Sequence, residues 1–424
     1  MRAVFSILTF IFFFSNSFAQ KNFYKAGMEA YRKGQYYLAI DCFKKYYSKS
    51  SDKEGKVKAL FIVGDCYYKL YDYRQAETYL SKAIKAKYPD PYVFLLLMLT
   101  QKEGGKYDEA INTFEEYKKR VPDAGNDFSI SCENAKKWLQ EPLAYTIENM
   151  AMINSKSRDM LPVFGRNLLT IYLSSTRANG NSDVPDACTG EPQSDIYFTR
   201  KDTSRGDWWS NPLSTGEFIN SVFNENSVCC GTAHHGFYFS RMVKDSRKKN
   251  SAEHLKLFYA DSTFGKYNAR VLDFCFTDTG NFNFDTPFLC ADGETLFFSS
   301  DMPGGYGGYD LWSVKWNSKE KHWEQAVNLG PRINSEADER SPFLFADILY
   351  FSSNNYKGMG GYDIYSSVSG EDAWGKPQNM QYPINSPQDD ISIVFEGNKD
   401  QGYICSNREG GKGSFDIWKF TPKH

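Results

Sequence analysis

The feature that most constrains the fold is a repeat in the second half of the sequence with a constant interval of 53 residues. In each copy an aromatic stretch ends in serine, and a bend rich in glycine or serine then leads to an aspartate. The second serine of the three clearest copies is Ser300, Ser353 or Ser406. The aspartate is Asp310, Asp363 or Asp416. A fixed period of this length indicates structural units that stack on one another.

Two looser copies precede these three. One contains Tyr172 to Ser175 with Asp195, and the other contains Phe237 to Ser240 with Lys256 in place of the aspartate. An Ile-Asn-Ser connector precedes four of the five copies, at residues 153–155, 219–221, 333–335 and 384–386. Each copy has room for four short antiparallel strands, the size of one propeller blade. The pattern therefore predicts an all-β propeller with five blades.

The two ends of this region predict how the propeller closes. The last copy stops at Phe420 and lacks the fourth strand that the other copies have before their connector. The missing piece occurs at the start of the region, where Glu148, Asn149 and Met150 precede an Ile-Asn-Ser connector. We expect Thr146 to Met150 to complete the final blade, which would cover an otherwise open sheet edge.

The first half of the chain has a different repeat. Alanines recur at equivalent places in three segments, Ala39, Ala76 and Ala110, which are 37 and then 34 residues apart. Large apolar residues follow at helical spacing, so the pattern predicts pairs of antiparallel helices. It resembles the tetratricopeptide repeat (TPR) family, whose preferred positions are also occupied by Gly27, Gly64, Tyr67 and Pro122. The third repeat departs from the family with Met98 at a small-residue position, and 126–140 is expected to form a capping helix.

The resemblances imply a domain order. The blade pattern, Ser-Pro followed by Asp-Gly, an aromatic strand and Gly-Gly-Tyr-Asp-Ile-Tyr, looks like the TolB-like (WD40-like) propeller family. An export signal, a TPR solenoid and such a propeller resemble the N-terminal part of envelope proteins of the PorE type, associated with type IX secretion. Those relatives continue into an OmpA-like peptidoglycan-binding domain, which this sequence lacks after the propeller. The expected domains are a signal peptide at 1–20, a TPR solenoid at 21–141 and a propeller at 142–424.

The N-terminus and the overall charge indicate the compartment. Arg2, an apolar run from Ala3 to Phe14, and small residues at Ser17 and Ala19 are typical of a cleaved export signal. The mature chain is expected to be periplasmic and associated with the outer membrane. It would carry 49 basic and 52 acidic residues, both signs spread evenly, which argues against nucleic acid as a partner. Nine cysteines are an odd number, so at least one would be unpaired.

Few residues suggest chemistry. The sequence contains no Gly-x-Ser-x-Gly, His-Glu-x-x-His or phosphate-loop motif, and we expect no enzymatic activity, no metal and no cofactor. Cys229 and Cys230 precede His234 and His235, but their expected places in a strand and its hairpin turn separate them too far for one metal ion. The repeated aspartates are expected to fix turns, although carboxylates around an axis could also hold a cation. Trp209, Trp323 and Trp374 share one repeat position and are expected to pack the blades.

Partner-binding positions follow from the TPR resemblance, in which the first helix of each repeat lines the inner surface. The corresponding residues are Tyr24, Met28 and Tyr31 in repeat one, Phe61, Asp65 and Tyr68 in repeat two, and Tyr92, Leu95, Leu99 and Lys102 in repeat three. Such an aromatic and apolar groove suits an amphipathic helix or an extended peptide. The alternative is that the groove is covered by another part of the chain. Trp208 is outside the repeated tryptophan position and is a candidate exposed anchor.

The expected function is a scaffold or adaptor that binds proteins of an outer-membrane or type IX secretion complex. Two alternatives stay open. The tyrosines and tryptophans of a propeller face can stack on sugar rings, so the propeller could bind glycans or peptidoglycan. The propeller could also be an inactive relative of a hydrolase or lyase.

Overall fold

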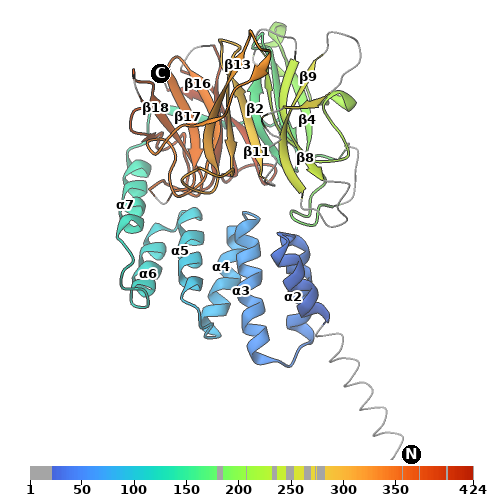
Figure 1. Ribbon diagram of the computed structural model, residues 1–424. Coiled ribbons are helices and arrows are strands. Elements are labelled where there is room, and N and C mark those ends of the chain that lie inside the picture. The colour runs from blue at the N-terminus through green and yellow to red at the C-terminus, as the bar shows by residue number, and fades with distance from the viewer. Residues whose placement is uncertain are drawn as a thin grey trace, which may run out of the picture. The chain divides into compact units, whose positions relative to one another are not determined.

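The structure is a computed structural model (Figure 1). The structure describes residues 22–178, 185–206, 208–231, 236–244, 253–261, 269–272, 274, 282–355, 357–371, 373–397 and 400–423. The expected signal peptide at 1–20 lies outside these residues. The chain forms two compact units. One runs up to Glu133 and includes Pro185–Glu191, and the other comprises Asn134–Val184 and the chain from Pro192 onward.

Seven helices occur at the N-terminal side of the described chain, as the TPR pattern predicts. They are residues 22–32, α2 (Tyr36–Lys49), α3 (Lys53–Lys69), α4 (Tyr73–Lys85), α5 (Tyr92–Glu103), α6 (Tyr107–Lys118) and α7 (Asp127–Gln140). The predicted pairing of three repeats and a following helix is confirmed. Among the described residues, no helix combines the length and apolar character needed to cross a bilayer.

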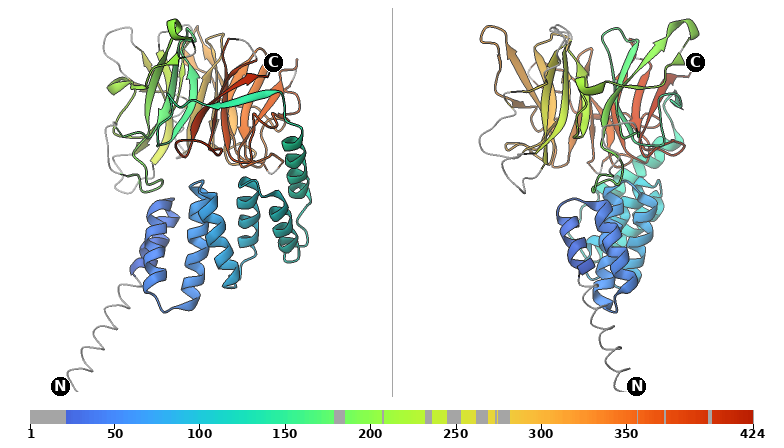
Figure 2. Two further views of the ribbon diagram at one scale, coloured as in Figure 1. Left: turned by 180° about the vertical axis from the view of Figure 1, so that it is seen from behind. Right: turned by 90° about the vertical axis from the view of Figure 1, so that its right-hand side faces the viewer.

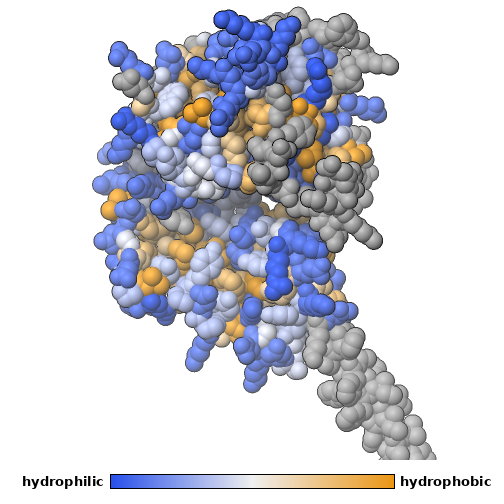
Figure 3. All heavy atoms as spheres, in the orientation of Figure 1, coloured by the Kyte–Doolittle hydropathy of each residue, from blue (hydrophilic) through white to orange (hydrophobic). Residues whose placement is uncertain are grey.

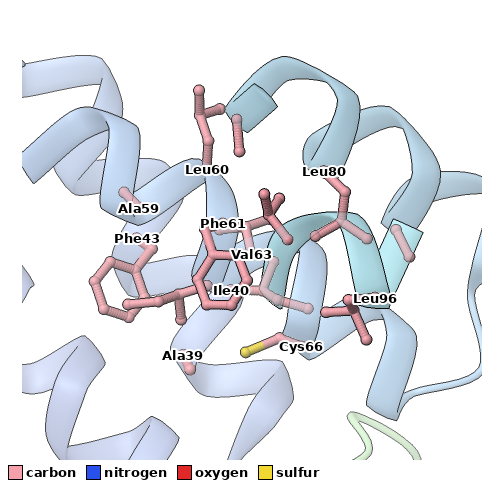
Figure 4. Packing of buried hydrophobic residues seen from close by; sticks show 14 of the residues in the cluster. Ala39, Ile40, Phe43, Ala59, Leu60, Phe61, Val63, Cys66, Leu80 and Leu96 are labelled. Atoms are coloured by element: carbon pink, nitrogen blue, oxygen red, sulfur yellow. The ribbon is translucent and has the colours of Figure 1, made fainter. Parts of the chain in front are cut away.

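Small residues let the helices of each pair approach closely. A Cβ atom on Gly27 would lie 2.9 Å from the Phe43 ring, and one on Gly64 would lie 2.8 Å from Leu80. The apolar side chains of the first two repeats form one core beside these crossings (Figure 4). Figure 4 shows Phe43, Phe61 and Leu80 converging from different helices. This explains why the sequence repeats glycine or alanine at the crossing positions.

The helix starts are capped in two ways. Asp52 and Asp72 accept backbone N–H bonds from the third residue after them, Gly55 and Gln75, as N-cap residues do. α2 has no side-chain cap. Instead, the N–H groups of Tyr37 and Leu38 donate to the carbonyls of Cys188 and Ala187, at 2.9 and 3.3 Å, within the same unit. A backbone segment far along the sequence thus satisfies donors that would otherwise lack a partner.

The second unit contains five antiparallel sheets, each built as one blade of the predicted propeller (Figure 2). Blade 1 has β2 (Asp159–Phe164), β3 (Thr170–Ser175), β4 (Asp195–Asp202), β5 (Trp208–Trp209) and β6 (Leu213–Ser214). Blade 2 has β7 (Glu225–Cys230), β8 (Gly236–Lys244), β9 (Glu253–Asp261) and β10 (Arg270–Val271). Blade 3 has β11 (Phe284–Leu289), β12 (Thr295–Ser300), β13 (Asp310–Asn317), β14 (His322–Trp323) and β15 (Val327–Asn328). Blade 4 has β16 (Glu339–Phe345), β17 (Ile348–Ser353), β18 (Asp363–Val368) and β19 (Gln378–Asn379).

Blade 5 joins the two ends of the propeller sequence. Its strands are β20 (Asp390–Phe395), β21 (Gly402–Ser406), β22 (Asp416–Pro422) and β1 (Tyr145–Asn149), in that order across the sheet. β1 pairs antiparallel with β22, and the register runs from Tyr145 opposite Pro422 to Asn149 opposite Trp418. The predicted closure is therefore confirmed, with the strand beginning and ending one residue earlier than expected.

The Ile-Asn-Ser connectors have a specific role in each junction between blades. The asparagine side chain accepts from the N–H and donates to the C=O of the residue after the repeated aspartate, at 2.7–3.0 Å. The asparagines and their partners are Asn154 with Ile417, Asn220 with Ile196, Asn334 with Leu311 and Asn385 with Ile364. Each amide thus extends the third strand of the preceding blade as a short strand would.

The connector serine anchors a buried acid at the start of the next blade. Its N–H and Oγ donate to the carboxylate at 2.5–3.1 Å. The four pairs are Ser155 with Asp159, Ser221 with Glu225, Ser335 with Glu339 and Ser386 with Asp390. Blade 3 lacks the connector, and Phe284 occupies the position of the acid, fully buried. The acid and its connector are therefore present or absent together.

The repeated aspartates mostly fix turns, as expected. Asp310 accepts from the backbone N–H groups of Tyr306 and Gly307, at 2.6 and 3.1 Å. Asp363 accepts from the N–H of Gly360, and Asp416 accepts from that of Gly413. The shared tryptophan position also behaves as predicted in two blades, because Trp209 and Trp323 are buried, while Trp374 is half-buried.

We predict that Asn385→Ala destabilises the propeller by about 2 kcal/mol, because the N–H of buried Ile364 loses its acceptor and its C=O keeps only the N–H of Met380 as a donor. Denaturant unfolding followed by tryptophan fluorescence measures this, since seven of the 8 tryptophans lie between residues 208 and 418. Asn211→Ala is the matched control, because Asn211 is exposed. Equal stability of the two variants would contradict the role assigned to the connector.

Candidate partner-binding surface of the helical repeats

The predicted groove residues lie on the first helix of each helix pair. Tyr24, Met28 and Tyr31 are on the helix at 22–32, Phe61, Asp65 and Tyr68 are on α3, and Tyr92, Leu95, Leu99 and Lys102 are on α5. Their packing divides them into three groups: tyrosines bonded to carboxylates, a cluster of aromatic rings, and residues that are partly or fully buried.

The first group contains a tyrosine bonded to a buried acid. The Tyr31 hydroxyl donates to Asp65 Oδ2 at 2.5 Å, and Asp65 is 2% exposed. The Lys69 ammonium lies 4.0 Å from the other oxygen. Burial raises the pKa of the Asp65 carboxyl, against the opposing effects of Lys69 and Tyr31. Burial and the bond to Asp65 also raise the pKa of the Tyr31 phenol.

The next repeat has a similar bond. The Tyr68 hydroxyl donates to Glu103 Oε1 at 2.8 Å. The two bonds join residues 34 and 35 positions apart, which is one repeat. Tyr31 and Tyr68, both predicted as partner contacts, therefore tie successive repeats together.

The second group is an aromatic cluster around Phe61. Its ring stacks on Tyr88, with 4.4 Å between centroids and 9° between planes, and meets the edge of Tyr92 at 6.2 Å. Phe61 is buried, whereas Tyr92 is 44% exposed. Tyr88 was not among the sequence candidates because it lies in the α4–α5 connection rather than at a repeat position. Tyr92 is thus the accessible face of a rigid aromatic stack.

The remaining groove residues have varied exposure. Tyr24 is half-buried and packs edge-on against Phe43 and Tyr46, so it belongs largely to the core of the repeats. Met28 and Leu95 are half-buried, while Leu99 and Lys102 are buried. The residues that retain exposed surface are therefore Tyr92 first and then Tyr24, Met28, Tyr31, Tyr68 and Leu95.

Two candidate sites that the sequence suggested in the propeller pack against neighbouring residues of the same unit. Trp208 is half-buried, and the Arg205 guanidinium lies 4.5 Å from the centre of its ring. Cys229 and Cys230 lie in β7 opposite Tyr238 and Phe237. Burial raises the pKa of both thiols, that of Cys230 to about 12. His234 and His235 lie outside the described residues, and within those residues no group of three or more metal-ligating side chains occurs.

The five innermost strands line a small cavity. It encloses about 50 Å³, and apolar side chains such as Pro162, Pro287 and Pro342 dominate its wall, with hydroxyls from Ser227 and Thr286 among them. This volume holds a water or two and is far below the several hundred Å³ of a typical ligand pocket. This central cavity is therefore too small to admit a partner.

Comparison with known protein families supports the helical repeats. A tetratricopeptide-repeat family model matches residues 58–91 and 92–124, the second and third predicted repeats. No curated protein matches the sequence. The chain is similar to a solved glycoside hydrolase at 10% identity, with a TM-score of 0.45, covering 69% of this chain and 95% of that one. A luciferin-regenerating enzyme is similar at 10% identity and a TM-score of 0.41, covering 65% and 95%.

An auxiliary nutrient binding protein from Bacteroides ovatus is similar at 11% identity and a TM-score of 0.32, covering 64% of this chain and 60% of that one. Structural likeness this distant carries no information on activity. The combination of TPR repeats and a propeller indicates a protein-interaction module.

We predict that Tyr31→Phe destabilises the helical unit by about 1–3 kcal/mol, because buried Asp65 loses a hydroxyl donor. Urea unfolding followed by circular dichroism at a helical wavelength measures the loss. In the Asp65→Asn background the same change should cost less, since no buried charge is left without its donor. Additive effects in this double-mutant cycle would contradict the coupling.

The raised pKa of Asp65 predicts a pH dependence. The folded state binds a proton at Asp65 more readily than the unfolded state does, so this group's contribution to stability falls as pH rises from about 4 through the folded-state pKa. The difference in unfolding free energy between Asp65→Asn and the unmodified protein should therefore grow in favour of the variant over that interval. A difference that is constant from pH 3 to pH 8 would show that the folded pKa is not raised.

Proposed function

We propose that the protein is a non-enzymatic scaffold of the bacterial envelope, exported to the periplasm and associated with the outer membrane. It would bind proteins of an outer-membrane or type IX secretion complex through the inner surface of its TPR helices and an outer surface of its propeller. Export is supported by Arg2, the apolar run at Ala3 to Phe14 and the small residues at Ser17 and Ala19. The order of repeats resembles that of PorE-type proteins.

The observation that carries the binding proposal is the exposed Tyr92 ring beside the stack of buried Phe61 and half-buried Tyr88. Rigid aromatic rings with a buried support are the usual anchors of protein interfaces, because they offer a large apolar area at a low cost in side-chain entropy. The half-buried Tyr24, Met28 and Leu95 extend this apolar surface. A helix or extended peptide with apolar anchors matches it best.

A non-enzymatic role is supported by the state of the reactive groups in the described residues. Asp65 and Glu103 accept hydrogen bonds from tyrosines of the preceding repeat. The thiols of Cys66, Cys229 and Cys405 are buried with raised pKa values, so they are protonated and poorly nucleophilic at neutral pH. These groups serve packing rather than catalysis.

We predict that Tyr92→Ala weakens capture of the partner about tenfold or more without unfolding the chain, because Tyr92 is 44% exposed and meets the buried Phe61 ring only with its edge. The test is crosslinking in intact cells with a C-terminal tag, followed by mass spectrometry of the co-purified proteins. Tyr31→Ala and Tyr68→Ala are poorer probes, since both would also break the bonds between repeats.

Tyr47→Ala is the matched control, because Tyr47 is 42% exposed but lies on α2, the second helix of its pair. Recovery of the same envelope proteins with Tyr92→Ala and with the unmodified chain would remove the groove from the proposal. Retention on purified glycans that is lost in Trp208→Ala, with no protein recovered, would favour the glycan-binding alternative.

A further inference from the structure

Charge is distributed unevenly along the helical repeats. Residues 22–87 contain 14 lysines and arginines against 7 aspartates and glutamates, whereas residues 88–133 contain 5 against 9. The even spread of charge expected from the whole chain is therefore wrong for this part. The first two repeats carry a net charge of +7.

Many of these cations gather at one end of the helix stack. Neighbouring helices are antiparallel, so the connections α2–α3 and α4–α5 lie at the same end (Figure 1). We call this end the basal rim and define it by Lys49, Lys53, Lys56, Lys82, Lys85 and Lys87. Hydrophilic side chains project from this end of the helices on the face shown in Figure 3.

Helix polarity explains only part of the rim. Lys49, Lys82 and Lys85 lie in the last turns of α2 and α4, where the helix dipole favours cations. Lys53 and Lys56 lie at the start of α3, beside Asp52 and Glu54, and the same dipole disfavours cations there. The fold of α3 does not require these two lysines, so they point to a binding role.

Five of the six rim lysines have no carboxylate partner within the described part of the chain. Lys53, Lys56, Lys82, Lys85 and Lys87 form no ion pair with any described residue. The ammonium groups of Lys56 and Lys82 instead lie over the rings of Tyr47 and Tyr79, at 5.1 and 5.0 Å from their centres. Tyr47 and Tyr92, near the same end, are each more than 40% exposed. Lysines beside exposed tyrosines are suited to the boundary between water and a lipid headgroup layer.

We propose that the basal rim binds the anionic phospholipid headgroups of a membrane surface. Charge complementarity supports this occupant, because the rim carries an excess of lysines and the helix at 22–32 adds the exposed Lys25 near its start. That helix is antiparallel to α2 and therefore starts at the rim. The binding is peripheral and electrostatic, and it does not depend on the partner-binding proposal.

The test is sedimentation with vesicles of phosphatidylcholine alone or with 30% phosphatidylglycerol, a composition that follows the electrostatic argument. The protein is purified from a host that exports it. It should bind the anionic vesicles, and binding should weaken as salt rises from about 50 to about 500 mM. Lys53→Glu should weaken binding at least about fivefold, and Lys53→Glu with Lys56→Glu should weaken it further.

Arg74→Glu is the matched control, because it makes the same charge change at an exposed position in the first turn of α4, at the opposite end of the stack. It should leave vesicle binding within about twofold. Lys53→Glu should not lower the unfolding temperature, because an acid in the first turn favours the helix dipole. Loss of binding in this variant therefore cannot be attributed to misfolding.

Three results would overturn the proposal. Equal binding to neutral and anionic vesicles would show that headgroup charge is not recognised. An equal effect of Arg74→Glu and Lys53→Glu would show that net charge alone is responsible. Salt-sensitive binding to polyaspartate without binding to anionic vesicles would assign the rim to an acidic protein segment instead of lipid.

Discussion

The pairing of β1 with β22 is the contact on which the second unit depends. It joins residues 145–149 to residues 418–422, so the outer strand of blade 5 comes from the start of the propeller sequence (Figure 2). Without it, the edge of β22 would be unpaired and the ring of five sheets would have two ends. Because these strands are more than 260 residues apart, the ring cannot close until the last blade has been made. Such a long-range contact makes closure a late and cooperative event in folding.

Hydrogen bonds from polar side chains also join each blade to the next, as the pairing of β1 with β22 joins the two ends of the ring. Each connector asparagine completes the hydrogen bonds of the third strand of one blade, and the serine after it anchors the acid that begins the next. Two neighbouring residues thus bond to two successive blades and fix the step between them. Blade 3 shows a variant, because Phe284 replaces the acid and packs against Phe298 of the same blade, with 5.9 Å between ring centres. Its junction with blade 2 uses other polar contacts, in which Asp285 accepts from Asn226 and Ser227. A polar blade junction can therefore form without the connector.

The repeats made the architecture predictable, because a period reports on backbone geometry that recurs in every copy. Ala39, Ala76 and Ala110 marked the helix crossings, and the missing fourth strand after Phe420 indicated the closure. Residue-level roles were less accessible, since they depend on contacts between copies. Tyr31 and Tyr68 occupy binding positions of the TPR pattern, yet their hydroxyls bond to Asp65 and Glu103 of the following repeat. Tyr88 lies between two helices, so no periodic pattern could identify it as the support of Phe61.

The effect of a residue on the stability of the fold helps to distinguish a structural role from a binding role. A tyrosine bonded to a buried carboxylate lowers the energy of the fold, so its presence on the inner surface says little about a partner. Lys53 and Lys56 have the opposite character, because the helix dipole of α3 works against them and no carboxylate of the described residues pairs with them. The ring of Tyr92 lies between these two cases, since it packs against Phe61 and yet is 44% exposed. The residues that the fold does not need are therefore those most informative about what the protein binds.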